Sequence, residues 1–136
     1  MTFPLSEPAR GSAVAAIADQ IKLEARAALC EIEVNTLDGE MTRSSLPIPH
    51  FIKMDVEGME YGALKGMYQT LRAHRPRLSI EIHGANMEDK IANVRRVVAF
   101  LEELGYRMRH IESAESITSG NAEHAFEGHL YCEAAA

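Results

Sequence analysis

The stretch from residue 51 to residue 84 constrains the fold of this chain most, because two predicted strands flank a predicted helix there. Residues 51–56 form a short apolar run with one lysine, which is typical of a strand covered on both faces. Beyond Glu57 and Gly58, apolar residues recur at helical spacing, the stripe being Met59, Leu64, Met67, Tyr68 and Leu71. Residues 78–82 then alternate between apolar and polar side chains. Strand, helix and strand in this order favour parallel neighbouring strands.

The second half of the chain continues this pattern. Asn86 is a candidate N-cap for a helix that Gly105 would end, with an apolar stripe of Ile91, Val94, Val98, Leu101 and Leu104. Residues 106–111 are predicted to form a strand, and a polar loop leads to a closing strand at residues 129–132. Because no helix separates these two strands, we expect an antiparallel hairpin. The predicted fold class is α/β: a mostly parallel sheet with a C-terminal antiparallel strand and helices on both faces.

The first 50 residues are less regular. The elements predicted there are an irregular lead-in over residues 1–11, an alanine-rich helix over residues 12–29, a strand over residues 31–37, a turn at Asp38 and Gly39, and a connection over residues 40–50. We therefore divide the chain into a lead-in with its helix, residues 1–30, and an α/β part, residues 31–136.

Composition narrows the classes of partner. A chain of 136 residues with net charge −6 has the size of one domain, and its charge argues against nucleic acid as a partner. No apolar run is long enough for a membrane span, and the prolines and charges at the start do not resemble a signal peptide. The two cysteines have no zinc spacing and are expected to be reduced thiols. We therefore expect a soluble, cytoplasmic protein that does not act at a membrane.

Acidic side chains and one histidine follow the two strands of the first stretch. Asp55 and Glu57 lie at the carboxyl end of the first strand, Glu60 opens the helix, and Glu81 and His83 end the second strand. Ligands of open α/β sheets bind beyond the carboxyl ends of the strands, so these residues should form one rim.

Several roles are open to this rim. The imidazole of His83 could act as a general base, and the carboxylates of Asp55, Glu57 and Glu81 could bind a hard divalent cation. Glu57 and Glu60 could also be present only because carboxylates stabilise a helix N-terminus. We assign no residue as a metal ligand. The other histidines show no ligand spacing and are expected on the surface or in loops: His50, His74, His110, His124 and His129.

The string IKMDVEGMEYGALKGM, followed after a short helix by RPRLSIEIH, resembles the FkbM family of methyltransferases. The matching residues are Asp55, Val56, Glu57, Gly58, Glu60, Leu64, Gly66, Arg75, Pro76, Glu81 and His83. The Thr36-Leu37-Asp38 element also resembles a segment that precedes this block in family members. The resemblance covers roughly residues 34 to 132 and leaves out the first 30.

This resemblance implies a Rossmann-like class I fold that moves a methyl group from S-adenosylmethionine, usually to a hydroxyl oxygen of a small metabolite or a sugar. Asp55 would lie at the end of the fourth strand, beside the position of methyl transfer. The position of the rim and the resemblance together lead us to expect catalytic roles for Asp55, Glu57, Glu81 and His83, and binding of the acceptor by Glu60.

The sequence departs from the family in the part that holds the cofactor. Gly11 and Gly39 are the only glycines before Phe51, and they do not form the glycine-rich turn through which backbone amides approach such a ligand. Cofactor-binding residues are therefore unassigned. We expect a truncated or split member of the family that has the acceptor side of the site and is inactive alone.

A missing first strand would leave the edge of residues 51–56 exposed. We expect the chain to dimerise there, to meet an N-terminal partner, or to cover the edge with residues 12–29 or 31–37. A non-catalytic binding or assembly module is the alternative function. A metal-dependent hydrolase that uses the acidic rim is a third.

Overall fold

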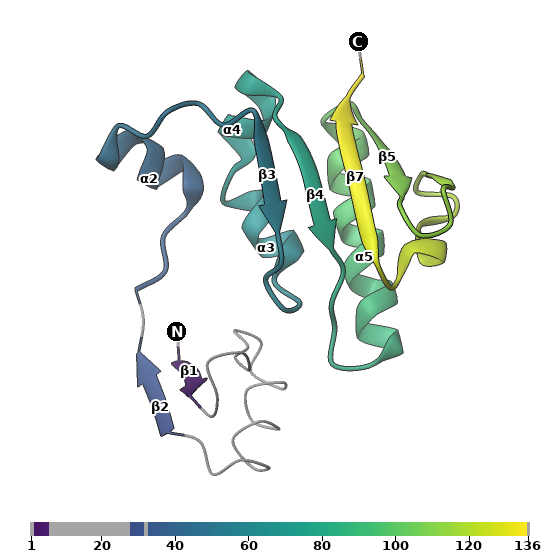
Figure 1. Ribbon diagram of the computed structural model, residues 1–136, viewed down its shortest axis with the longest axis horizontal. Coiled ribbons are helices and arrows are strands. Elements are labelled where there is room, and N and C mark those ends of the chain that lie inside the picture. The colour runs from purple at the N-terminus through teal and green to yellow at the C-terminus, as the bar shows by residue number, and fades with distance from the viewer. Residues whose placement is uncertain (1, 6–27, 32, 136) are drawn as a thin grey trace.

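The computed structural model describes residues 2–5, 28–31 and 33–135 (Figure 1). The elements, in chain order, are β1 Thr2–Leu5, β2 Ala28–Glu31, α2 Leu37–Ser44, β3 Phe51–Met54, α3 Glu60–Lys65, α4 Tyr68–His74, β4 Arg77–Glu81, α5 Met87–Glu103, β5 Tyr106–His110, β6 Ser116–Ile117, the 3-10 helix η1 Ala122–Ala125 and β7 His129–Ala134. The mixed α/β class is confirmed. β1 and β2 pair antiparallel, and the other strands form one five-stranded sheet.

The five-stranded sheet has the order β3-β4-β7-β5-β6 and is mostly antiparallel. Among its pairs, only β3 and β4 are parallel, so the prediction of a mostly parallel sheet is wrong. The reason is the place of β7. The chain crosses from β4 through α5 to β5 and then returns as β7, which enters between β4 and β5 and pairs antiparallel with both. The antiparallel pairing of the last two predicted strands is thereby confirmed.

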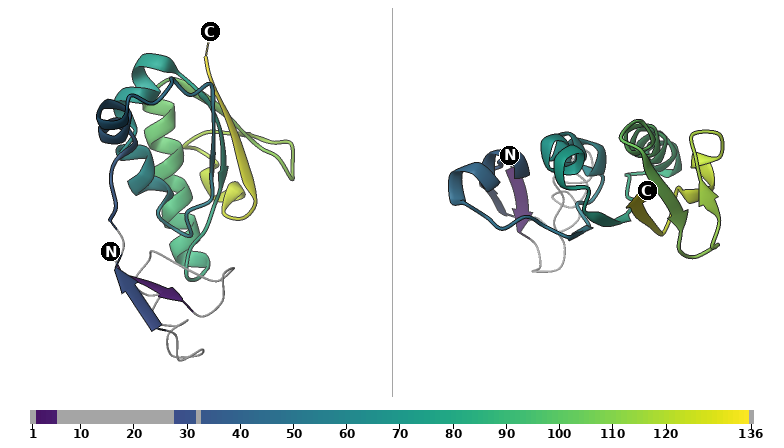
Figure 2. Two further views of the ribbon diagram at one scale, coloured as in Figure 1. Left: turned by 60° about the vertical axis from the view of Figure 1, so that its left-hand side comes forward. Right: turned by 90° about the horizontal axis from the view of Figure 1, so that it is seen from above.

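The helices α3, α4 and α5 lie together on one face of this sheet (Figure 2). No other described element covers the opposite face, so the prediction of helices on both faces is wrong for this part of the chain. β4 shows the consequence, because Leu78 and Ile80 are buried against the helices while Arg77 is exposed. The predicted double cover of residues 51–56 is also wrong: Phe51 is 52% exposed.

The single helix predicted after Gly58 is divided into α3 and α4 at Gly66 and Met67. The carbonyl of Gly66 accepts a hydrogen bond from Asp38 N at 3.1 Å, and a Cβ on this glycine would lie 3.3 Å from Thr36 Cγ2. The segment before β3 therefore packs directly on the break between the two helices, which explains why the helix does not continue.

The segment before β3 is helical, contrary to the prediction of a strand over residues 31–37 and a connection afterwards. Residues 33–36 form no strand, and α2 begins at Leu37 because the Thr36 hydroxyl caps it, accepting a hydrogen bond from Gly39 N at 3.1 Å. The predicted turn at Asp38 and Gly39 is thus the first turn of a helix. Most of the helix predicted over residues 12–29 lies outside the described residues, and its last two residues belong to β2.

Candidate functional site

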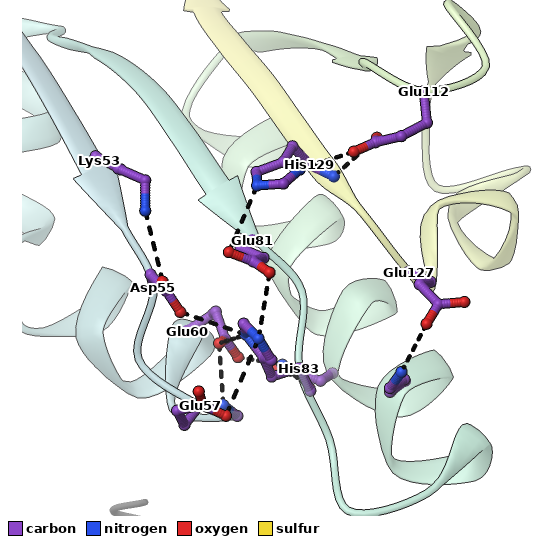
Figure 3. A network of polar contacts seen from close by, with 12 residues as sticks. Lys53, Asp55, Glu57, Glu60, Glu81, His83, Glu112, Glu127 and His129 are labelled. Carbon is purple, nitrogen blue, oxygen red and sulfur yellow. Dashed lines mark hydrogen bonds and ion pairs between the residues drawn. The ribbon is translucent and has the colours of Figure 1, made fainter. Parts of the chain in front are cut away.

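The acidic rim predicted from the sequence is formed at the carboxyl ends of β3 and β4 (Figure 3). The parallel register pairs Met54 with Ile80, so Asp55 and Glu81 come next on neighbouring strands. His83 follows two residues after Glu81. Gly84 then passes close to α5, since a Cβ on this glycine would lie 2.6 Å from Lys90 N. This close passage holds the chain immediately after His83 against the helix.

His83 lies at the centre of the rim, with a carboxylate oxygen from each of four residues within 4.0 Å of its ring nitrogens. Nδ1 is 3.9 Å from Asp55 and 3.5 Å from Glu60, and Nε2 is 4.0 Å from Glu57 and 3.5 Å from Glu81. The structure thus brings together all five residues that the sequence singled out. The buried Nδ1 makes no hydrogen bond to the described residues, and the side chain as a whole is 23% exposed.

Glu60 is fully buried beneath His83. Its carboxylate accepts hydrogen bonds from Gly58 N at 3.0 Å and from the side-chain amide of Asn93, which also donates to the carbonyl of His83 at 3.0 Å. The geometry makes Glu60 a support for the imidazole, while its role in binding an acceptor stays a prediction. Asn93 was not found from the sequence, although a polar side chain beside Val94 on the apolar stripe of α5 was a usable signal.

The remaining carboxylates are accessible from solvent. Asp55, Glu57 and Glu81 have side chains that are 42%, 47% and 32% exposed. Glu57 and Gly58 both have positive φ, 51° and 93°, so the chain turns sharply after β3 and brings Glu57 beside the imidazole. A ligand approaching from solvent would meet these three carboxylates first.

The rim carries more negative than positive charge. Among the lysines that the structure describes, Lys53 alone forms an ion pair with it, its Nζ lying 3.5 Å from Asp55 Oδ2. Donor atoms of Asp55, Glu81 and His83 all lie within 4.8 Å of one another, a spacing that one cation could span. The arrangement can therefore hold a proton on His83, bind a hydroxyl or attract a cation.

The polar contacts continue from Glu81 across β7. His129 Nε2 is 3.4 Å from Glu81 Oε2, and His129 Nδ1 is 2.7 Å from Glu112 Oε1. His110, expected on the surface or in a loop, is instead buried, with Nε2 3.1 Å from Glu112 Oε2 and Nδ1 hydrogen-bonded to Ser113 Oγ. The sequence carried no signal for this network, because β7 is placed beside β4 only by the return of the chain.

A family model described as the methyltransferase FkbM domain matches residues 5–108. The chain belongs to this family. The match includes both strands of the rim and starts within the first 30 residues of the chain. Comparisons with curated proteins and with solved structures gave no match.

The described residues of this FkbM domain do not by themselves fit S-adenosylmethionine. The one glycine described before β3, Gly39, lies inside α2, and the outer edge of β3 is paired with no other described strand. We therefore derive no chemical step through the cofactor. In the described part of the chain, no helix is long and apolar enough to cross a membrane.

Proposed function

We propose that this FkbM domain carries the acceptor side of a methyl transfer from S-adenosylmethionine to a hydroxyl group of a small molecule or sugar. The observation that supports the proposal is the position of His83 among the four carboxylates of the rim, in a chain of a methyltransferase family. An imidazole nitrogen can accept a proton from a hydroxyl, and the ring nitrogens of His83 lie at the centre of the rim where such a hydroxyl would bind.

The proposed role of each rim residue in removing the hydroxyl proton follows from its position. Asp55 is exposed, and its carboxylate can accept a hydrogen bond from the acceptor hydroxyl and turn the oxygen toward the reacting centre. His83 takes the proton, and Glu57 and Glu81 stabilise the resulting positive charge from the Nε2 side. Glu60 does the same from the buried side. The negative rim favours neutral or cationic acceptors over phosphorylated ones.

Methyl transfer can be measured with S-adenosylmethionine labelled on its methyl group and with simple sugars and small alcohols as acceptors. The cofactor is supplied at millimolar concentration so that weak binding does not hide transfer. The chain alone is expected to be inactive at micromolar cofactor. At millimolar cofactor we expect labelled methyl ethers from the wild-type chain and a loss of at least about 100-fold in Asp55→Asn. The matched control is Glu88→Gln, an exposed carboxylate in the first turn of α5. Absence of transfer to every hydroxyl acceptor, or equal rates in both variants, would contradict the proposal.

Binding of the cofactor can be measured separately by isothermal titration calorimetry. Because the described residues contain no glycine-rich turn, we expect no micromolar binding of S-adenosylmethionine to the chain alone. Micromolar binding would show that a cofactor site is complete within these 136 residues.

The second candidate is an assembly module, which is favoured by the outer edge of β3, because no other described strand pairs with it. Phe51 on this strand and Ile48 just before it are about half exposed, and so is Val34 upstream. We propose that a second copy of the chain, or an N-terminal partner, pairs with this edge. In sedimentation analysis a dimer that dissociates in Phe51→Ser would support this candidate. A monomer that keeps full activity would count against it.

A further inference from the structure

His129 and Glu112 form a hydrogen-bonded pair beside the rim, and the proposed function does not use this pair. Two hydrogen bonds join these residues: Glu112 Oε1 lies 2.7 Å from His129 Nδ1, and Glu112 Oε2 accepts from His129 N at 2.9 Å (Figure 3). The backbone is shaped for this contact. Gly128 has φ 97°, and a Cβ there would lie 2.5 Å from Glu112 Oε2, so only glycine leaves room for the carboxylate.

Glu81 connects this pair to the proposed base. One carboxylate oxygen, Oε1, is 3.5 Å from His83 Nε2, while the other, Oε2, is 3.4 Å from His129 Nε2. The carboxylate therefore lies between two imidazoles. Its orientation toward His83 depends on what its other oxygen meets on β7.

The charged groups around His129 explain why it can hold this carboxylate. Glu112 from the loop after β5 and Glu81 from β4 are negative, whereas Lys53 on β3 is positive and opposes them. The hydrogen bond that Glu112 accepts from the ring raises the pKa of His129 above its usual range, and the charges of Glu81 and Glu112 add to this, although burial of the ring opposes it. Hydrogen bonds from the backbone and ring of His129 lower the pKa of Glu112 to about 2. The surroundings of His129 thus favour the protonated form of its ring, which faces Glu81.

We propose that His129 and Glu112 are positioning residues of the acceptor site, which hold the Glu81 carboxylate in its place beside His83. Glu112 fixes the ring of His129, His129 holds Glu81 Oε2, and the remaining oxygen of Glu81 faces the imidazole that takes the proton. The role of His129 and Glu112 as positioning residues rests on the proposed function, whereas their contacts with each other and with Glu81 do not depend on it.

The test uses His129→Phe, which removes the ring nitrogens, and Glu112→Gln, which removes the charge that fixes the ring. His124→Phe is the matched control, because His124 is also hydrogen-bonded to a glutamate, Glu115, in an exposed contact. Long-range ¹H–¹⁵N spectra report the ring nitrogens of His83 in each chain. We expect these signals to move in the first two variants and to stay in the control.

Kinetics of methyl transfer provide the second measurement. We expect kcat to fall about 10–100-fold in His129→Phe with the KM for S-adenosylmethionine unchanged. We also expect the double variant Glu81→Gln/His129→Phe to be no slower than Glu81→Gln alone. Unmoved His83 signals in His129→Phe, or additive losses in the double variant, would overturn the inference. If the wild type methylates no hydroxyl acceptor, the proposed function fails, and the His83 signals still decide whether His129 and Glu112 position this site.

Discussion

Replacement of Asn93 by alanine should destabilise the domain strongly, because its side-chain amide donates to two acceptors at the base of the rim. Asn93 is 3% exposed, and its Nδ2 donates to the buried carboxylate of Glu60 and to the carbonyl of His83. Asn93→Ala leaves both acceptors without this donor. The oxygen of the Asn93 amide accepts no hydrogen bond from the described residues, so the loss comes from the donor side.

The magnitude follows from these two contacts. A buried polar group left unpaired costs about 1–3 kcal/mol, and Glu60 retains its bond from Gly58 N, so we expect a loss of about 2–4 kcal/mol in the free energy of unfolding. For a chain of 136 residues, this corresponds to a melting temperature lower by roughly 6–16 °C. Urea denaturation followed by far-ultraviolet circular dichroism is the suitable assay, since the chain has no tryptophan.

The matched control is Arg95→Ala on the same helix. Arg95 is 60% exposed and pairs with Glu123 at 3.6 Å, so its removal should cost less than about 1 kcal/mol. If Asn93→Ala loses no more stability than Arg95→Ala, the amide does not support Glu60 and His83, and the description of the buried side of the rim is wrong.

Three further predictions concern pH, the contact of α2 and metal ions. In the folded state the pKa of Glu112 is lowered to about 2 and that of His129 is raised. Their pair therefore stabilises the folded state fully between about pH 4.5 and 6.5. This stabilisation is lost as pH falls toward 2 or rises through the folded pKa of His129. Within that window Glu112→Gln should therefore lower the free energy of unfolding by no more than about 1 kcal/mol, because the pair is exposed, and the effect should be smaller at pH 3. Asp38→Asn should lower the free energy of unfolding by about 1–2 kcal/mol in the same assay, because the Asp38 carboxylate accepts hydrogen bonds from Gln69 N, Thr70 N and Thr70 Oγ1. Burial would raise the pKa of Asp38, but these hydrogen bonds lower it. A chelator should leave methyl transfer unchanged; loss of transfer that Mg²⁺ restores would instead make Asp55, Glu81 and His83 metal ligands.

The strands β3, β4, β5 and β7, the helix α5 and the rim could be predicted because each depends mainly on local sequence. The apolar residues that alternate in residues 78–82 are buried in β4, and most of the apolar stripe of α5 is buried as well, so the sequence pattern matches the burial in the structure. The rim follows from the rule that parallel neighbours bring their carboxyl ends together, and β3 and β4 obey it.

Features that depend on distant parts of the chain could not be predicted in this way. The insertion of β7 between β4 and β5 changes the sheet from parallel to mostly antiparallel pairing, yet β7 itself has an ordinary alternating pattern. The start of α2 depends on a cap at Thr36 and on the contacts of Asp38 with α4, which override the alternation of residues 31–37. His129 and Glu112 lie 17 residues apart and meet because β7 returns beside β5.

The most direct test of the central claim is the rate of methyl transfer to a hydroxyl acceptor by His83→Asn, at millimolar S-adenosylmethionine and beside the Glu88→Gln control. The substitution removes the group that takes the proton and leaves the three exposed carboxylates in place. We expect transfer to fall at least about 100-fold in His83→Asn, as is usual when a general base is lost. A rate within about twofold of the wild type would contradict the claim that the rim around His83 deprotonates the acceptor.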